Sequence, residues 1–197
     1  MIEIRDSVEI PIGRSPHRAP TFVTFSGLQD NLEHFAVVFK SSSDDYAPKV
    51  RIHSECITGD LFHSERCDCG NQLGFAIDML NESGGVLLYL RQEGRGIGLY
   101  EKLSAYKLQD NGIDTFSANR LLGHKDDGRD FTFVPSMLSA LGVSKIRLIT
   151  NNPAKISVFS GSEVSLVEII NTPTFLNQNN IRYLTAKQKH GHNITIR

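Results

Sequence analysis

The apolar residues of this 197-residue sequence change their spacing part-way along the chain, and that change limits the folds open to it. In the N-terminal quarter, β-branched and aromatic residues gather at residues 21–25, 34–39 and 48–53, with polar turn-forming residues between these runs. Such runs predict strands. From residue 71 to residue 81 the apolar residues instead recur at the spacing of one helix face. The sequence therefore predicts a β-rich N-terminal part that is followed by a helix.

Helices and strands are expected to alternate after this point. Two consecutive glycines end the helix, and residues 86–90 have the continuous apolar character of a buried strand. Leu99, Leu103 and Tyr106 then mark one face of a second helix, which should end near Asn111. Tyr106 on that face is more typical of a core residue than of a catalytic one.

The C-terminal part continues the alternation. A third helix should end at Gly142, and residues 145–150 should form a strand. Asn152 followed by Pro153 is a favoured pairing at a helix start, and residues 180–192 are expected to be partly helical. The fold class predicted is therefore α+β (mixed α/β), with a β-rich N-terminal part followed by alternating helices and strands.

The composition describes a globular chain with almost no net charge. Hydrophobic residues make up 40%, and 21 lysines and arginines nearly balance 22 aspartates and glutamates. A neutral chain lacks the positive field that holds nucleic acid, and no apolar run approaches the ~18 residues of a membrane span. The N-terminal segment resembles no secretory signal, so we expect a cytoplasmic protein. Because no repeat or long linker is found, we predict one domain over residues 1–197.

All the cysteines of the chain lie within one short stretch, at Cys56, Cys67 and Cys69. An odd number of thiols excludes a closed disulfide framework, and clustered thiols in a reducing compartment are typical of metal ligands. Zinc takes four ligands, and catalytic zinc sites usually combine three protein ligands with water. Three thiolates without an obvious fourth ligand therefore fit an open zinc site that activates water.

Three alternatives stay open for these cysteines. His53 or His63 could supply a fourth ligand and close a structural zinc site. The three thiols could also be buried and inert. His53-Ser54-Glu55 is half of the signature of zinc-dependent nucleobase deaminases, but the Pro-Cys-x-x-Cys half is missing because this chain has Cys-x-Cys.

Three further segments are candidate phosphate sites. Residues 91–98 place glycines and two arginines, Arg91 and Arg95, between a predicted strand and a predicted helix, an arrangement suited to phosphate oxygens. The alternative there is an ordinary β-to-α turn with a solvated ion pair. Residues 126–130 and 150–155 are the other two candidates, with a solvated loop and a plain helix cap as their alternatives. Taken with the thiols, these segments point to hydrolysis of a small phosphorylated substrate.

Longer runs of the sequence resemble GTP cyclohydrolase II. The zinc-binding segment of that family is similar to RIHSECITGD at residues 51–60 and to RCDCGNQL at residues 66–73. The next family block resembles YLRQEGRGIGL at residues 89–99. Other similar stretches are AYKLQD at 105–110, Asp114-Thr115, Ala118-Asn119, DGRDF at 127–131 and LITNNP at 148–153. The resemblance runs from about Thr21 to His192.

The resemblance implies an enzyme that opens the imidazole ring of GTP at C8 and releases formate and pyrophosphate. The product is a diaminopyrimidinone ribosyl phosphate, and the reaction is the first step of riboflavin synthesis. The family holds one catalytic zinc per chain, here at Cys56, Cys67 and Cys69. Magnesium is expected with the triphosphate, because this hard cation prefers phosphate oxygens. Family members are typically homodimers, so we expect GTP and a second copy as partners, without nucleic acid or membrane.

The resemblance also assigns roles to single residues. Tyr106 matches a tyrosine near the ring chemistry, so the core reading of Tyr106 gives way to a catalytic one. Asp127 matches a proposed proton acceptor, and Arg129 matches a proposed nucleophile at the α-phosphate. The positions that match GTP contacts are Arg51, Ile52, His53, Ser54, Glu55, Gln72, Glu93, Gly94, Arg95, Thr115, Thr150 and Lys155.

The sequence departs from the family in its C-terminal part. Residues 159–170 read FSGSEVSLVEII where the family usually shows a Gly-Ile-x-Val strand, and residues 171–174 lack the usual Arg-x-Pro-Leu. These departures bear on C-terminal packing and on the pathway served. Two alternatives therefore accompany the main prediction, a paralogue in another heterocycle pathway and a non-catalytic, zinc-stabilised nucleotide-binding module. We expect a monofunctional chain, because nothing here resembles the dihydroxybutanone phosphate synthase domain of bifunctional relatives.

Overall fold

The structure, a computed structural model, describes residues 1–15, 18–41, 47–189 and 191–195. The chain forms two compact units whose segments alternate along the sequence. The first unit consists of Met1–His53, Gly74–Arg91 and Phe131–Thr172. The second consists of Ser54–Leu73, Gln92–Asp130 and Pro173–Arg197. Since each unit draws on three stretches of chain, neither is a contiguous segment, and the single domain over residues 1–197 stays a prediction.

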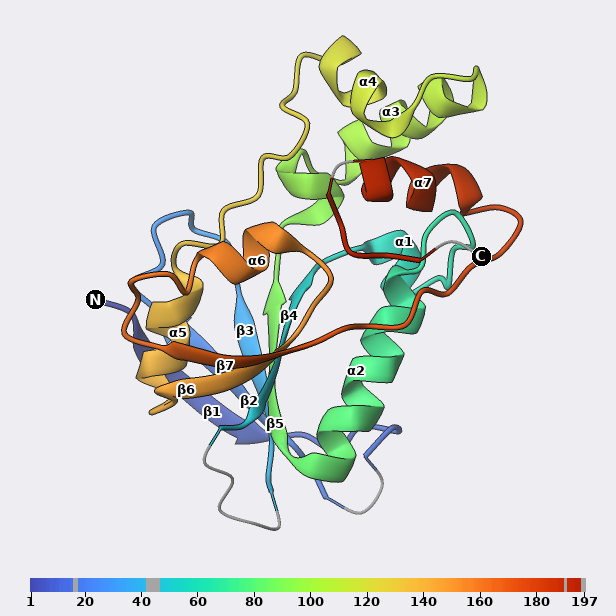
Figure 1. Cartoon of the computed structure of the whole chain (residues 1–197). Coiled ribbons are helices and arrows are strands. Elements are labelled where there is room, and N and C mark those ends of the chain that lie inside the picture. The colour runs from blue at the N-terminus through green and yellow to red at the C-terminus, as the bar shows by residue number, and fades with distance from the viewer. Residues whose placement is uncertain (16–17, 42–46, 190, 196–197) are drawn as a thin grey trace. The chain divides into compact units, whose positions relative to one another are not determined.

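The first unit is built on a seven-stranded mixed sheet with the strand order β1-β2-β3-β5-β4-β6-β7 (Figure 1). The pairs β1/β2, β2/β3 and β3/β5 are antiparallel, whereas β4/β6 and β6/β7 are parallel. The strands are β1 (Glu3–Glu9), β2 (Thr21–Ser26), β3 (Phe35–Phe39), β4 (Lys49–Ser54), β5 (Gly85–Leu90), β6 (Lys145–Ile149) and β7 (Ser165–Ile170).

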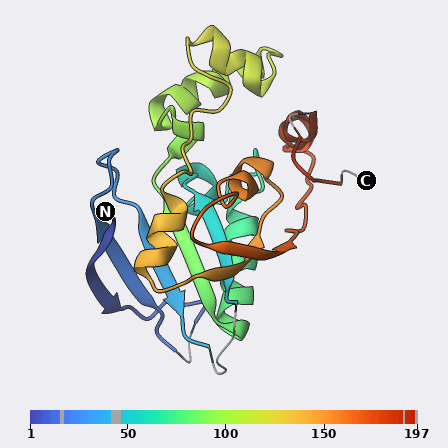
Figure 2. The ribbon, with the colours of Figure 1, turned by 60° about the vertical axis from the view of Figure 1, so that its left-hand side comes forward.

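Both faces of the middle of this sheet are covered. Alternate side chains of β5, Val86, Leu88 and Leu90, join one hydrophobic core with residues of α5 (Val134–Ala140). Leu87 points to the other face, since successive residues of a strand alternate, and it is buried as well. Figures 1 and 2 show α5 on one side of the sheet and α2 (Cys69–Ser83) on the other. This double cover explains why β5 is almost continuously apolar.

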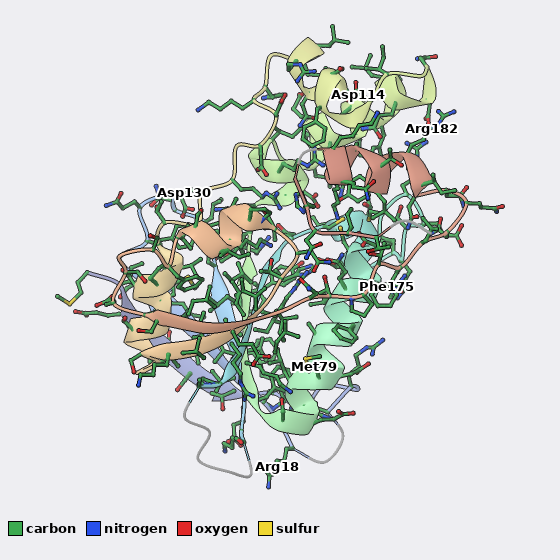
Figure 3. All side chains as sticks on the ribbon, viewed as in Figure 1. Arg18, Met79, Asp114, Asp130, Phe175 and Arg182 are labelled. Atoms are coloured by element: carbon green, nitrogen blue, oxygen red, sulfur yellow. The ribbon has the colours of Figure 1, made fainter. Side chains whose placement is uncertain are left out.

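The second unit is mainly helical. It contains α1 (Ile57–Asp60), the start of α2, a 3-10 turn η1 (Glu93–Gly96), α3 (Leu99–Asp110), α4 (Thr115–Leu121) and α7 (Ile181–Lys189). Asp114 begins α4, where its carboxylate accepts hydrogen bonds from the backbone N–H groups of Phe116 at 3.0 Å and Ser117 at 3.2 Å (Figure 3). These bonds satisfy donors that the first turn of a helix leaves free.

The predicted fold class is confirmed, and the predicted elements form with ends shifted by a few residues. Asn152 begins α6 (Pro153–Ser157) as its cap, with Oδ1 accepting from the Ala154 N–H at 2.9 Å. The helix over residues 99–110 forms with Leu99 and Tyr106 half-buried as predicted, but the prediction is wrong for Leu103, which is 44% exposed, whereas Lys102 and Ala105 are buried. Among the described residues, no helix is long and apolar enough to cross a membrane.

Candidate active site

The three cysteine sulfurs converge within the second unit. All three lie within 4.8 Å of one another, and Sγ of Cys56 is 3.6 Å from Sγ of Cys67. Thiolates bound to one tetrahedral zinc at about 2.3 Å stand roughly 3.8 Å apart, so the cluster fits such an ion. Among the described residues, the group of candidate ligands holds these cysteines and neither His53 nor His63. This favours the open, three-thiolate site over the site closed by histidine.

A glycine makes room for the cluster. The first thiol precedes the short helix α1, and the other two flank the start of α2. Gly59 in α1 packs against the sulfurs, and a Cβ added there would lie 2.9 Å from Sγ of Cys67 and 3.1 Å from Sγ of Cys56. Asp60 Oδ2 accepts a hydrogen bond from the Cys56 N–H at 3.0 Å, which fixes the start of this turn. The turn therefore needs a residue without a side chain at position 59.

A buried lysine neutralises the cluster. Lys102, on α3, donates from Nζ to Sγ of Cys56 at 3.1 Å and to Oε1 of Glu93 at 2.9 Å. Glu93 also accepts from the N–H groups of Ile57 at 2.6 Å and Gly94 at 2.7 Å. A zinc ion held by three thiolates would carry one net negative charge, and the Lys102 ammonium contacts both this group and the carboxylate of Glu93. The sequence analysis did not identify Lys102. The only sign of its burial in the sequence is that Leu99 and Tyr106 lie one helical turn away on the same face of the predicted helix.

The same contacts set the protonation of the cluster. Hydrogen bonds with the thiols of Cys67 and Cys69, helped by the Lys102 ammonium, outweigh burial and lower the pKa of Cys56 to about 3. The hydrogen bond to Cys56 raises the pKa of Cys67 above its ordinary value. Burial acts to lower the pKa of Lys102, but the charges of Cys56 and Glu93 outweigh it and raise that pKa. Cys56 is therefore a thiolate beside a charged lysine at neutral pH.

Tyr106 lines the pocket that contains the thiols, and two cations lie near its ring. The guanidinium of Arg66 stands 4.8 Å from the centre of its ring, and the Lys102 ammonium 5.8 Å. Arg66 is itself paired with Asp110. Burial raises the pKa of Tyr106 to about 12, although the charge of Lys102 opposes this. The hydroxyl therefore stays protonated at neutral pH and can donate a hydrogen bond into the pocket.

Arg95 reaches the same pocket from the turn η1. Its guanidinium lies 4.2 Å from the centre of the Phe116 ring, and Nη1 is buried without a hydrogen-bond partner among the described residues. A buried donor normally has a partner. An acceptor from a bound molecule would satisfy Nη1, which makes Arg95 a candidate contact for an anionic group.

Arg129 and Asp127 form an ion pair that lies partly in this pocket. Nη2 of Arg129 is 2.5 Å from Oδ2 of Asp127, and Nε is 2.9 Å from Oδ1. Burial acts to raise the pKa of Asp127, but the hydrogen bonds and charge of Arg129 hold it below its ordinary value. The pair raises the pKa of Arg129 in turn. Arg129 also reaches Oγ of Ser54, at 3.4 Å from Nη1.

A family assignment agrees with this geometry. Residues 8–171 match the sequence profile of the family described as GTP cyclohydrolase II. The chain belongs to the GTP cyclohydrolase II family. It is 50% identical over 198 residues to GTP cyclohydrolase-2 of Vibrio parahaemolyticus, covering all of both chains. It is 50% identical to the Vibrio cholerae protein of that name over 97% of both chains, and 48% identical to that of Aliivibrio fischeri over 100% and 99%. The prediction of a GTP cyclohydrolase II enzyme is confirmed.

The structure gathers most of the predicted site residues of this family member in the second unit. One pocket is lined by Ser54, Glu55, Glu93, Gly94, Arg95 and Tyr106, together with Arg129 and all three cysteines. Gln72 lies on α2 and donates to Oδ2 of Asp68 at 2.6 Å. Thr115 is the first residue of α4, and its side chain lies outside what the structure describes.

The remaining predicted contacts belong to the first unit. Nη1 of Arg51 donates to the carbonyl of Ile149 at 3.2 Å, and Nζ of Lys155 donates to the carbonyl of Ile52 at 2.8 Å. His53 is buried against the ring of Tyr89.

The three candidate phosphate segments differ in outcome. Residues 126–130 contain the Arg129–Asp127 ion pair, and Arg129 lines the pocket. Residues 150–155 contain at least the expected helix cap, because Oδ1 of Asn152 accepts from the N–H of Ala154 at 2.9 Å. The two arginines of residues 91–98 have different surroundings. Arg91 belongs to the first unit and pairs at 3.8 Å with the exposed Glu33. Arg91 therefore shows the solvated ion pair, whereas Arg95 enters the pocket.

Proposed function

We propose that this enzyme hydrolyses GTP with zinc at Cys56, Cys67 and Cys69. The reaction opens the imidazole ring at C8 and releases formate and pyrophosphate, giving 2,5-diamino-6-(5-phosphoribosylamino)pyrimidin-4(3H)-one for riboflavin biosynthesis. One observation carries the proposal: a three-thiol cluster lines the same pocket as a buried arginine nitrogen that has no acceptor in the part of the chain that the structure describes. The substrate named for the relatives, GTP, combines a ring to be hydrolysed with a triphosphate to be held.

The donor set suits zinc, since thiolates are soft ligands and one of the three is already ionised. When bound, zinc supplies a Lewis acid that activates water for attack on a ring carbon. The work of the protein is then to hold the three sulfurs at the right spacing and to balance their charge. Lys102 supplies that charge, and Glu93 fixes Lys102 through the 2.9 Å ion pair.

The pocket residues bind and orient the nucleotide. Arg95 offers the free Nη1 donor to a phosphate oxygen, and its position over Phe116 limits the movement of the guanidinium. Tyr106 stays protonated and donates from its hydroxyl to an acceptor atom of the base. Proton donors held in place before reaction stabilise the charge that develops on an opening ring.

Arg129 and Asp127 act at the phosphates. The resting pair is fully ionised, so Arg129 can hold a phosphate oxygen with no proton transfer. Attack by Arg129 on the α-phosphate additionally requires the guanidinium to lose a proton. Asp127 is the acceptor in contact with it, at 2.5 Å and 2.9 Å. Alkaline quenching during turnover of GTP labelled at the α-phosphate tests this step. A nucleophilic Arg129 expels pyrophosphate and leaves a guanylyl adduct joined by a P–N bond, which base preserves and acid hydrolyses, and which Arg129→Ala cannot form.

Several finer features belong to the same proposal. Thr115 and Gln72, with Arg51, Ile52, His53, Thr150 and Lys155 of the first unit, are proposed to contact GTP. Magnesium is proposed to bind the triphosphate, because it prefers phosphate oxygens. The enzyme is proposed to work as a homodimer in the cytoplasm, where reducing conditions keep three free thiols available.

Product analysis by mass after incubation with GTP, zinc and magnesium tests the proposal. We expect formate, pyrophosphate and the diaminopyrimidinone ribosyl phosphate, and no reaction from Cys67→Ser. Release of ammonia without formate would indicate deamination. Zinc-loaded protein that binds GTP and leaves it unchanged would indicate a paralogue with another substrate, or a non-catalytic nucleotide-binding module.

A further inference from the structure

The helix α7 lies beyond the segment that matches the family profile, which ends at residue 171. Nevertheless, α7 belongs to the same compact unit as the thiols, and Tyr183 from its first turns lines the same pocket (α7 in Figure 1). Two side chains of α7 contact the loop that carries Cys67 and Cys69.

The first contact is a buried ion pair. Nζ of Lys187 is 3.0 Å from Oδ1 of Asp68, the residue between the two cysteines. The Asp68 side chain has no exposed surface, and that of Lys187 is 13% exposed. Oδ2 of Asp68 accepts from Gln72, so the carboxylate has a partner on each oxygen. A buried carboxylate is stable only with such partners, so the position of α7 and the shape of the Cys-x-Cys loop depend on each other.

The second contact reaches a sulfur. The hydroxyl of Tyr183 lies 3.9 Å from Sγ of Cys69. Cys69 is the half-buried member of the cluster, whereas Cys56 and Cys67 are 6% and 5% exposed. The ammonium of Lys187 lies 4.4 Å from the centre of the Tyr183 ring, within the range of a cation–π contact. One side chain therefore both secures α7 and orients the tyrosine toward the most accessible thiol.

We propose that α7 is a positioning element of the metal centre. The Lys187–Asp68 ion pair holds α7 against the Cys-x-Cys loop, and the Tyr183 hydroxyl donates a hydrogen bond to the Cys69 thiolate. That hydrogen bond lowers the basicity of the sulfur, so the thiolate resists the protonation that would release a bound metal. Outer-shell partners of this kind change metal affinity by about 10- to 100-fold. The inference rests on the proposed function only in that the cluster holds a metal.

Zinc transfer to a chromogenic chelator tests the inference without any turnover. We expect the full-length zinc protein to release its metal about tenfold faster after Lys187→Ala and several-fold faster after Tyr183→Phe. Lys187→Arg keeps the charge and should restore slow release. The matched controls are Lys189→Ala, an exposed lysine of the same helix, and Tyr100→Phe, a tyrosine that is 83% exposed. Both controls should release zinc at the parent rate.

Cobalt(II) in place of zinc separates positioning from general destabilisation. Loss of the hydrogen bond makes the Cys69 thiolate a better electron donor, so Tyr183→Phe should shift the sulfur-to-cobalt charge-transfer band to lower energy. A tyrosine that only packs would leave this band unchanged. Equal release rates in all variants, with an unshifted band, overturn the inference while the proposed function stands. A parent protein that binds neither zinc nor cobalt overturns both, and a metal-loaded parent inactive on GTP overturns the proposed function alone.

Discussion

Replacing Lys102 by methionine tests the charge balance of the thiol cluster most directly. Methionine keeps the length and most of the volume of the side chain and removes its charge. In the structure Lys102 is 8% exposed and stands 3.1 Å from Sγ of Cys56 and 2.9 Å from Oε1 of Glu93. The substitution therefore leaves a buried carboxylate and a buried thiolate without their shared cation.

The size of the effect follows from these distances. Two unit charges about 3 Å apart attract by roughly 5 kcal/mol at an effective dielectric constant of about 20. Desolvation of the ammonium offsets part of this, and breaking a buried ion pair typically costs about 3–5 kcal/mol. Glu93 keeps its two backbone donors, Ile57 and Gly94. We therefore expect the free energy of unfolding to fall by about 3 kcal/mol, at the lower end of that range.

Urea unfolding of the metal-free protein measures this loss, and competition with a chelator measures zinc affinity, which should fall about tenfold or more. Lys107→Met, on an exposed position of the same helix, is the matched control. Lys102→Met combined with Glu93→Gln should recover part of the stability, because it removes the unpaired carboxylate and leaves only the Cys56 thiolate without its cation. If Lys102→Met is as stable as Lys107→Met and binds zinc as tightly as the parent, the charge-balance reasoning is wrong.

Four further substitutions test other parts of the site. Gly59→Ala places a methyl group 2.9 Å from Sγ of Cys67, so we expect loss of bound zinc, measured by metal analysis, in protein that keeps its circular dichroism. Tyr106→Phe should slow formate release at least tenfold with zinc content unchanged, and loss of zinc as well would make the tyrosine structural. Arg129→Ala should abolish pyrophosphate release and leave GTP binding detectable by calorimetry. Asp114→Ala removes the cap of α4 and should cost about 1 kcal/mol in urea unfolding, whereas Asp114→Asn should cost little. Hydrogen bonds from Ser117 lower the pKa of Asp114, so the cap contribution should be complete above the ordinary carboxyl pKa of about 4 and lost as pH falls through the lowered value.

Sequence patterns predicted those elements whose cause is local. The strand over residues 86–90 and the cap at Asn152 follow from a continuous apolar run and from a side chain that bonds its own helix. The grouping of the cysteines was visible because a short stretch of chain contains all three. For the same reason, α4 could have been found at Asp114, whose carboxylate caps the residues that follow it.

Other features depend on partners distant in sequence. Every side chain of β1 is exposed, so the spacing of its apolar residues does not indicate a strand. Only the pairing with β2 reveals β1. On α3, the apolar spacing placed Leu103 on the buried face, but the structure exposes Leu103 and buries the neighbouring Lys102. A lysine can be buried where an acid and a thiolate pair with its charge. Here these partners are Glu93 and Cys56, which lie nine and 46 residues away in sequence. Periodicity within one helix contains no information about such partners.

Arg95 enters the pocket from a strained backbone conformation. Gly94 and Arg95 both have left-handed backbone angles, with φ of 64° and 63°. Glycine adopts this conformation freely, whereas a residue with a side chain pays about 1–2 kcal/mol. The turn is held by a hydrogen bond from the Gly128 N–H to the Arg95 carbonyl at 3.0 Å, where Gly96 lets the two backbones approach closely. A glycine at position 95 would relieve the strain but would remove the guanidinium from Phe116 and from the pocket. A strained arginine in a glycine-rich turn is therefore best explained by its buried Nη1, which has no hydrogen-bond partner within the described ranges. This supports the proposal that the turn binds an anion and is more than a simple β-to-α connection.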